Sequence, residues 1–519
     1  MRAPALLALA LIGAAPAPAA PLVRTDSGLL AGKTSGGVDA FLGVPYAAPP
    51  VGPLRWRAPQ PVASWTHARD ATRFGAACYQ DAAGAWGPYS AEFLAAPPVS
   101  EDCLFLNLWK PAGVRKGLPV LVYIHGGAFA GGSGSVPVYD GASLARRGLV
   151  VVTINYRVGV FGFLAHPGLT AEGQGSGNYG LLDQVAALRW IKANAARFGG
   201  DPARVTIAGE SAGAASVNDL QMMPAAKGLF ARAVSISGAS MAIDTPTLAA
   251  GEADGDALAE RLGTHSAADL RAIPAERLLA ATKVVPGSGP PRLTYVPHVD
   301  GAVLPADPGD PLAPRAARVP LLTGFNGEEM IDPSVHTPAD LGRALRARYG
   351  AFADTLLPLY PHATDAEAAA SNAQIARDRY MAGLLIWAAA RPRTARDPIW
   401  LYRHDWPYPA VRGGQSWGAF HSSSLPYLFG NLGLGDRPFG PADRALSARW
   451  QEVIAAFAAT GNPALPGRPW RAFGMGTTQV MAFGQTQGPG PALTPAVSTP
   501  QRLAAWRAYA AAGGRLGLM

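Results

Sequence analysis

The segment at residues 205–213 constrains the fold of this chain more than any other. Four residues of strand character, 205–208, run directly into Gly209-Glu210-Ser211-Ala212-Gly213, which has the pattern G-x-S-x-G. Small residues follow, as at the start of a helix. A serine hydroxyl is a poor nucleophile unless it is exposed and paired with a base. A sharp turn from strand to helix exposes it, and the flanking glycines let the two elements approach closely. The segment therefore predicts a nucleophilic Ser211, with a glycine-rich structural turn as the alternative.

The regions before and after this turn predict an α/β protein. Apolar runs at 118–124 and 149–154 are typical of buried parallel strands, which have both faces covered. Residues 181–198 have helical periodicity and stand directly before the strand that leads to Ser211. Further strands are expected at three places, 233–236, 319–323 and 399–403. Helical stretches are expected at 248–281, 339–390, 445–457 and 503–511, and a low-complexity connector rich in Gly, Pro and Thr at 484–500. Strands and helices that alternate in this way indicate βαβ units around a parallel sheet.

Composition excludes two classes of partner. The chain has 519 residues and a net charge of +8, from 44 Lys+Arg and 36 Asp+Glu, but the basic residues are scattered. A protein that binds nucleic acid gathers them on one stripe with interleaved aromatics, so no nucleic-acid partner is expected. No segment reaches eighteen apolar residues without charge, Gly or Pro, so no stable membrane insertion is expected either.

The first twenty residues have the features of a secretory signal peptide. Arg2 precedes an apolar run at 5–14, and Ala17-Pro18-Ala19 has the A-x-A form of a cleavage site, with cutting expected after Ala19 or Ala20. We therefore predict a signal peptide at 1–20 and an exported protein, periplasmic or secreted.

Two cysteines, Cys78 and Cys103, are the only ones in the chain. An even cysteine count in an exported protein suggests one disulfide, with two free buried thiols as the alternative. A bond that closes a loop of this length stabilises a fold by about 3 kcal/mol. The loop carries Trp86, Tyr89 and Phe93, which either line a pocket or fix the loop to the surface.

Candidates for the base and the acid follow Ser211, in the chain order that this kind of turn requires. His404 ends a strand-like run and is interpreted as structural, whereas His421 lies in a loop beyond it, where a base is expected. The acid belongs in the loop after the strand at 319–323. Periodicity leaves three choices for it: Glu328, Glu329 and Asp332.

A glycine loop supplies candidate donors for an oxyanion. His125-Gly126-Gly127-Ala128 follows an apolar strand, and glycines let backbone N–H groups turn toward a substrate. Loss of one such donor typically costs about 3 kcal/mol of transition-state stabilisation. His125 itself is expected to support the loop rather than to act as the base.

These segments together resemble the type-B carboxylesterases, the family that includes cholinesterases and bacterial para-nitrobenzyl esterases. The resemblance covers nearly the whole chain after residue 20. It rests on the motifs at 41–46, 101–107, 125–128, 155–157, 209–213 and 425–430. It implies an α/β-hydrolase fold: a mostly parallel central sheet with helices on both faces and large insertions, as a single catalytic domain at 21–519.

The resemblance also implies a catalytic triad. Ser211 is the nucleophile and His421 is the general base. Residues 324–329 match the family's acid-bearing pattern, which makes Glu329 the acid.

Other positions carried over from the family support this site. Gly126, Gly127 and Ala212 are the expected oxyanion donors, and Cys78 and Cys103 match the family's first disulfide.

Three further residues match the family in other roles. Glu101 and Arg157 resemble a structural ion pair, and Glu210 resembles a buried acid beside the nucleophile.

The chain departs from the family pattern at three positions. Glu328 stands where the pattern has Asp, and Met330 stands where it has Gly. Ser424 stands where many relatives carry an acid, which is expected to alter the hydrogen bonds behind the site.

The expected function is hydrolysis of small-molecule carboxylic esters through an acyl-enzyme, without a cofactor or a metal. Hydrolysis of an amide, carbamate or lactone by the same residues is one alternative, and a non-catalytic binding protein is another. The sequence leaves the oligomeric state and the substrate open. Five residues are candidate pocket linings: Trp86, Phe93, Phe325, Met330 and Trp417.

Overall fold

The structure is a computed structural model of the 519-residue chain. It describes residues 20–517 except 82–83, 115, 239–244, 284–292, 393, 475 and 485–490. The predicted signal peptide, apart from Ala20, lies outside the described residues.

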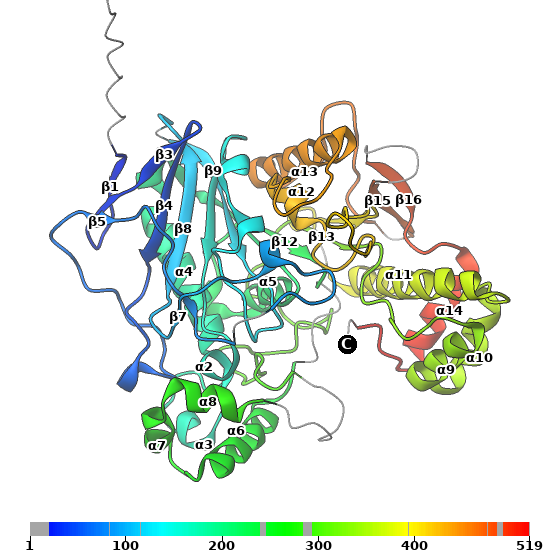
Figure 1. The fold of residues 1–519 in the computed structure, drawn as a ribbon, viewed down its shortest axis with the longest axis horizontal. Helices are drawn as coiled ribbons and strands as arrows, with labels where there is room; N and C mark the ends of the chain where they lie inside the picture. The colour runs from blue at the N-terminus through cyan, green and yellow to red at the C-terminus, as the bar shows by residue number, and fades with distance from the viewer. Residues whose placement is uncertain are drawn as a thin grey trace, which may run out of the picture.

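A twisted sheet of eleven strands forms the centre of the molecule (Figure 1). Its strands in chain order are β3 (Lys33–Ser35), β4 (Val38–Pro45), β8 (Phe105–Pro111), β9 (Leu118–Ile124), β10 (Val150–Ile154), β11 (Gly200–Glu210), β12 (Arg232–Ile236), β13 (Leu321–Asn326), β14 (Ile399–His404), β15 (Gln479–Phe483) and β16 (Ala492–Pro495). In space they follow the order β16-β15-β14-β13-β12-β11-β9-β10-β8-β4-β3. The strands from β10 to β15 pair in parallel, and the antiparallel pairs lie toward the two edges.

Side chains alternate between the two faces of the sheet, and helices cover both faces. On β9, Val120 and Val122 pack into the core that includes α4 (Tyr179–Asn194) and α5 (Ala212–Met222). Leu121, from the same strand, packs into the opposite core with α12 (Leu425–Phe429) and α13 (Pro441–Thr460). The strand is apolar throughout because neither face meets water. The predicted α/β architecture is therefore confirmed.

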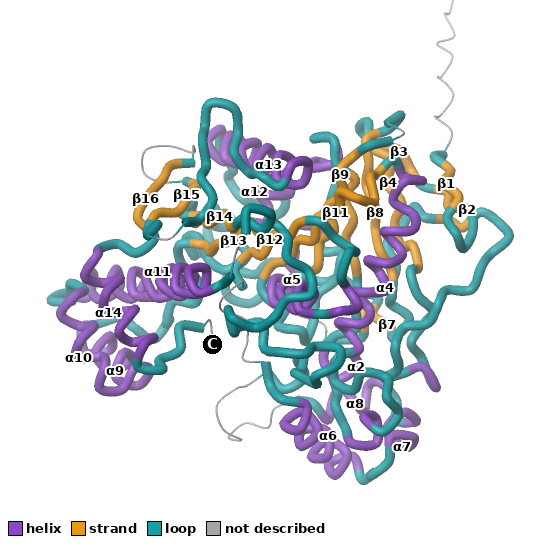
Figure 2. The backbone as a smooth tube through the Cα atoms, turned by 180° about the vertical axis from the view of Figure 1, so that it is seen from behind, coloured by secondary structure: helices purple, strands orange, loops and turns teal. Residues whose placement is uncertain are grey.

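Two groups of helices form the large insertions (Figures 1 and 2). One group follows β12 and consists of α6 (Leu248–Leu262), α7 (Ala267–Ala272) and α8 (Ala275–Ala281). The other contains α9 (Pro338–Tyr349), α10 (Ala353–Leu356) and α11 (Asp365–Ala390), together with the C-terminal α14 (Pro500–Ala511). Both groups lie where helical stretches were predicted. Among the described helices, none is long and apolar enough to cross a bilayer.

The sequence analysis missed a strand at one edge of the sheet. The low-complexity connector predicted at 484–500 has residues 485–490 outside the described residues, and its later part forms β16. Among the described strands this four-residue strand pairs with β15 alone and leaves Leu493 half-exposed, so it has neither the length nor the apolar run of a central strand.

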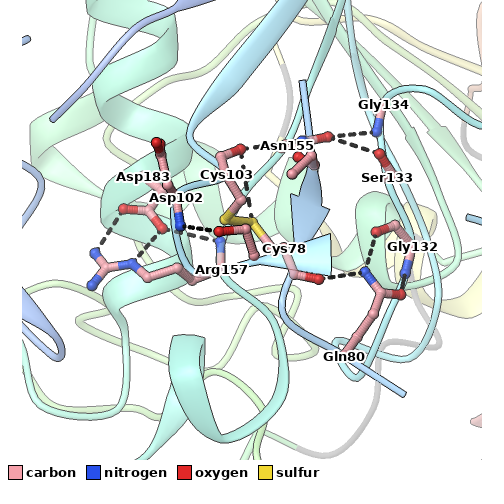
Figure 3. Close-up of a disulfide and its surroundings, with 12 residues drawn as sticks. Cys78, Gln80, Asp102, Cys103, Gly132, Ser133, Gly134, Asn155, Arg157 and Asp183 are labelled. Carbon is pink, nitrogen blue, oxygen red and sulfur yellow. Dashed lines mark hydrogen bonds and ion pairs between the residues drawn. A yellow bond between two sulfur atoms is a disulfide. The ribbon is translucent and has the colours of Figure 1, made fainter. Parts of the chain in front are cut away.

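The single disulfide joins Cys78 to Cys103, as predicted (Figure 3). The loop that it closes is tied to the glycine loop at 126–132. Gln80 donates to the carbonyl of Gly132 at 2.8 Å and accepts from the Gly132 N–H at 2.7 Å. The amide of Asn155 donates to the carbonyl of Cys103 at 3.1 Å. The disulfide loop and the glycine loop are therefore one hydrogen-bonded unit.

The predicted ion pair between Glu101 and Arg157 is wrong. Arg157 pairs with the buried Asp183 of α4 at 2.7 Å, as Figure 3 shows. Glu101 instead receives the guanidinium of Arg55, with Nε at 2.6 Å from Oε2. Each charged residue is structural, as expected, but with a partner that no motif in the sequence marks.

Candidate active site

The turn from β11 into α5 has the geometry that exposes a serine. Ser211 has φ 58° and ψ −124°, a conformation that costs an L-residue about 1–3 kcal/mol. A Cβ on Gly209 would lie 2.2 Å from the Gly213 carbonyl oxygen, and a Cβ on Gly213 would lie 2.1 Å from the Ile124 carbonyl oxygen. The two glycines are therefore required by close backbone contacts on either side of Ser211.

Glu329 holds one side of the His421 ring. Its Oε2 lies 2.5 Å from His421 Nδ1. Its Oε1 accepts a hydrogen bond from the Ser237 hydroxyl and another from the Asn326 N–H at 2.9 Å. The carboxylate has no exposed surface. Two donors from two different elements thus fix the orientation of the acid.

The other two acids that the sequence left open face elsewhere. Glu328 accepts from the Ala419 N–H at 2.7 Å. Asp332 lies in an exposed turn and accepts from the hydroxyl and N–H of Ser334. The structure thus brings only Glu329 of the three onto the His421 ring.

Glu210 holds the opposite side of the ring. Its Oε1 lies 3.1 Å from His421 Nε2 and accepts a hydrogen bond of 2.7 Å from the Ser422 hydroxyl. Glu210 is buried, as predicted for an acid beside the nucleophile. The imidazole therefore lies between two carboxylates, one at each nitrogen.

These carboxylates determine the charge of His421. Burial lowers the pKa of the imidazole, but Glu210 and then Glu329 outweigh burial and raise the pKa of His421 to about 9. Burial also raises the pKa of Glu210, while His421 and the Ser422 hydroxyl oppose that rise.

The other buried histidines near the site behave in the opposite way. Burial lowers the pKa of His125 and that of His404 to about 4, so both rings stay neutral. His404 lies in the core, where its Nδ1 accepts from the indole N–H of Trp450 at 3.2 Å. His125 stacks on Tyr156 and its Nδ1 contacts the Gly126 carbonyl. Both rings thus have the structural surroundings expected for them.

The glycine loop lies directly against Ser211. A Cβ on Gly126 would lie 3.0 Å from the Ser211 Cβ, and one on Gly127, at φ +112°, would lie 2.3 Å from the Gly131 carbonyl oxygen. The Tyr156 hydroxyl donates to the carbonyl of His125 at 2.9 Å and anchors the start of the loop. Glycine is therefore the residue that fits at both positions beside the nucleophile.

A cavity of about 660 Å³ opens over this arrangement. Its lining includes Ser211, His421 and the three predicted oxyanion residues Gly126, Gly127 and Ala212. Among the described residues, no three His, Cys, Asp or Glu side chains are placed to share a metal ion.

The disulfide loop forms an aromatic wall of the cavity. Trp86, Tyr89 and Phe93 all line it, as does Met330. The hydroxyl of Tyr89 donates to the His421 carbonyl at 3.1 Å, which joins this wall to the loop that carries His421.

Two of the predicted lining residues lie elsewhere. Phe325 is buried in the core behind β13, where it stacks on Tyr380 at 5.9 Å. Trp417 is 41% exposed and does not belong to the described lining. Phe325 points away because side chains alternate along a strand, and its segment was predicted to be a loop but belongs to β13.

Sequence reasoning missed two residues that contact the site through hydroxyl groups, Ser237 and Ser422, and it named Tyr89 as an aromatic of the disulfide loop without a role for its hydroxyl. Ser237 follows the last residue of β12 and faces Glu329, which position alone could have suggested. Ser422 stands next to His421 in the run 421–424, where nothing in the sequence tells one serine from the next.

Comparison with known proteins decides the family. A family profile described as "Carboxylesterase family" matches residues 19–497, which include every residue of the site. This chain belongs to the carboxylesterase family. It is a carboxylesterase, and its substrates are small-molecule esters.

The similar proteins agree with this assignment. A para-nitrobenzyl esterase of Bacillus subtilis is 37% identical over 87% of this chain and 92% of its own length. A fumonisin B1 esterase of Sphingopyxis macrogoltabida is 38% identical over 91% of this chain and 88% of its own length. A solved para-nitrobenzyl esterase structure covers 93% of this chain and 99% of its own with a TM-score of 0.76 at 34% identity. The fold is thus the predicted α/β-hydrolase fold.

Proposed function

We propose that this chain hydrolyses esters through an acyl-enzyme on Ser211, with His421 as base and Glu329 as the acid that orients it. The observation that carries the proposal is the placement of His421: Glu329 fixes Nδ1, while Ser211 lines the same cavity as the imidazole. A carboxylate at Nδ1 keeps a proton there and directs the other nitrogen to act as base.

The reaction then has two halves. Ser211 Oγ attacks the ester carbonyl carbon, and Nε2 of His421 takes the hydroxyl proton. The tetrahedral intermediate collapses when the C–O bond to the alcohol breaks and His421 returns the proton to the leaving oxygen. Water next attacks the acyl carbon with His421 as base, and the acid is released with Ser211 regenerated.

The N–H groups of Gly126, Gly127 and Ala212 are proposed to bind the oxyanion. Their residues line the cavity beside Ser211, and a Cβ added to Gly126 would lie 3.0 Å from the Ser211 Cβ. Donors held by the backbone before the reaction stabilise the charge without reorganisation.

The charge of His421 sets the pH at which this chemistry runs. An imidazolium cannot accept the Ser211 proton, so the competent form is the one present above the pKa of about 9. Activity is expected to rise with pH through that value rather than through 6.5, the usual value for histidine.

Export to the periplasm or medium is a second proposal, supported by the leader at 1–20 and the disulfide. Expression of the full chain, followed by mass analysis of the extracytoplasmic protein, tests it. A mature chain that begins at Ala20 or Pro21 is expected. An uncleaved cytoplasmic protein would contradict it.

The catalytic proposal is tested by hydrolysis of para-nitrophenyl acetate, butyrate and octanoate, with the Ser211→Ala variant beside the native protein. Loss of a triad serine can remove about six orders of magnitude of rate. We expect activity in the native chain and none above background in the variant. Equal activity in both would exclude Ser211 as the nucleophile. Activity on amides or lactones alone would change the proposed substrate class from esters to those compounds. If none of these substrates is turned over in a Ser211-dependent way, a binding role is favoured.

A further inference from the structure

We propose that Ser422 is a positioning residue that holds the Glu210 carboxylate against Nε2 of His421. The inference rests on the proposed function, in which Nε2 is the basic nitrogen. Ser422, the residue next to the base, thus keeps the Glu210 anion beside Nε2 of His421.

The first argument is the hydrogen bond itself. Ser422 Oγ donates to Glu210 Oε1 at 2.7 Å, and the same oxygen lies 3.1 Å from His421 Nε2. Both Ser422 and Glu210 are buried. A hydroxyl that donates to a buried carboxylate stabilises the charged form of that carboxylate.

The second argument is the backbone at Ser422. Its φ is 74°, in the left-handed region that favours glycine. A serine there carries strain that glycine would relieve. In exchange for this strain, the serine side chain supplies the hydroxyl that donates to the Glu210 carboxylate.

Its two neighbours show that burial alone does not give a serine hydroxyl in this run a hydrogen-bond partner. Ser423 and Ser424 are buried, and within the described part of the chain their hydroxyl groups have no hydrogen-bond partner. Neither of them donates to Glu210, so Ser422 is the serine of this run whose hydroxyl reaches that carboxylate.

The groups that face this pair come from several elements. Glu329, from the loop after β13, and Glu210, at the end of β11, both face His421. Tyr89 of the disulfide loop lies close enough to feel the charge of Glu210, as do three core tyrosines: Tyr123, Tyr139 and Tyr402. Burial raises the pKa of all four tyrosines, so they remain neutral and Ser422 is the hydroxyl that contacts the carboxylate directly.

Removal of the Ser422 hydroxyl therefore shifts the proton between Glu210 and His421. Without this donor the Glu210 anion is less stable, so its pKa rises and the carboxyl competes better for the proton. Nε2 then loses part of its anionic partner, and the neutral imidazole becomes more populated at a given pH. The titration midpoint of His421 is expected to fall by about one pH unit.

The experiment compares Ser422→Ala, Ser422→Gly and Ser423→Ala with the native protein. Alanine removes the hydroxyl and keeps the strain, glycine removes both, and Ser423→Ala removes a neighbouring hydroxyl that has no partner. Two quantities are measured: the pH midpoint of kcat/KM on para-nitrophenyl acetate, and the titration of the His421 imidazole by NMR with carbon-labelled histidine. Thermal unfolding is followed in parallel.

Both Ser422 variants should lower the midpoint by a similar amount, with Ser422→Gly melting at or above Ser422→Ala, and Ser423→Ala should leave the midpoint unchanged. An unmoved midpoint in both Ser422 variants, or a shift in only one of them, overturns the inference. Failure of the proposed function gives a different result, namely hydrolysis that does not depend on Ser211. In that case the NMR titration of His421 still tests the role of Ser422.

Discussion

The two sides of the His421 ring carry the same chemical group in different settings. At Nδ1, Glu329 is fixed by the Ser237 hydroxyl and the Asn326 N–H, and it is wholly buried behind the ring. At Nε2, the Glu210 carboxylate is held by the Ser422 hydroxyl, and Glu210 lines the cavity together with Ser211. Each nitrogen of the ring thus has one carboxylate beside it, but the surroundings of the two carboxylates differ.

What differs is access to the reacting atoms. Glu329 has no exposed surface and is not among the described residues that line the cavity, so it can orient His421 and stabilise its charge without contact to substrate. Glu210 precedes the nucleophile and shares the cavity wall with it. The comparison therefore assigns orientation of the ring to Glu329, which also stabilises its charge, and assigns to Glu210 the largest single electrostatic effect on the pKa of His421.

The largest expected effect is that of Glu329→Gln. The amide places an N–H₂ group or a weaker acceptor at Nδ1, so the ring loses its anionic partner and its fixed tautomer. We expect kcat to fall about 10⁴-fold with little change in KM. A loss below tenfold, measured with para-nitrophenyl acetate, would break the assignment of Glu329 as the orienting acid.

Glu210→Gln is expected to act mainly along the pH axis. Because the charge of Glu210 is the largest single contribution that raises the pKa of His421 to about 9, its removal should move the midpoint of kcat/KM toward 6.5. The plateau at high pH should fall about tenfold, since the imidazolium that forms during the reaction loses one anion. A 10⁴-fold fall with no change in midpoint would make the two carboxylates equivalent.

Ser237→Ala sharpens the account of the Nδ1 side. Glu329 keeps the Asn326 N–H but loses the hydroxyl, so it stays in place with more freedom. We expect kcat to fall about fivefold, less than the full loss of a hydrogen bond to a charged group because the Asn326 N–H still holds the carboxylate, with the pH midpoint within half a unit of the native value. A shift in midpoint as large as that of Glu210→Gln would contradict the division of roles.

Glu328→Gln is the matched control, with the smallest expected effect. This carboxylate is adjacent to Glu329 in sequence but accepts from the Ala419 N–H, a bond that an amide oxygen can also accept. We expect less than a twofold change in kcat/KM at any pH. A large loss would mean that the acid of the triad has been assigned to the wrong neighbour.

Much of the fold was predictable because its signals are local. The apolar run at 118–124 coincides with β9. The glycines around Ser211 mark a tight turn, because close backbone contacts leave no room for a Cβ at these positions. The short edge strand β16 and the partner of Arg157 carry no such signal. An edge strand needs no apolar pattern, and an ion pair depends on which distant elements meet.

The sequence predicted the individual residues of the site better than the hydrogen bonds and contacts between them. Ser211, His421 and Glu329 stand in recognisable motifs, but periodicity alone left Glu328, Glu329 and Asp332 open. The contact between Glu210 and Nε2 and the hydrogen bond from Ser422 depend on side-chain directions in a loop. These are set by packing at long range, which a single sequence does not record.

The most direct test is the rate at which an organophosphonate labels Ser211, followed by intact mass and peptide mapping from pH 5 to 10. Labelling needs the nucleophile and its base but no knowledge of the natural ester. We expect one label on Ser211, a rate that rises through about pH 9, an earlier rise in Glu210→Gln and slow labelling at every pH in Glu329→Gln. A label on another residue, or the same uniform loss of rate in both variants, would contradict it.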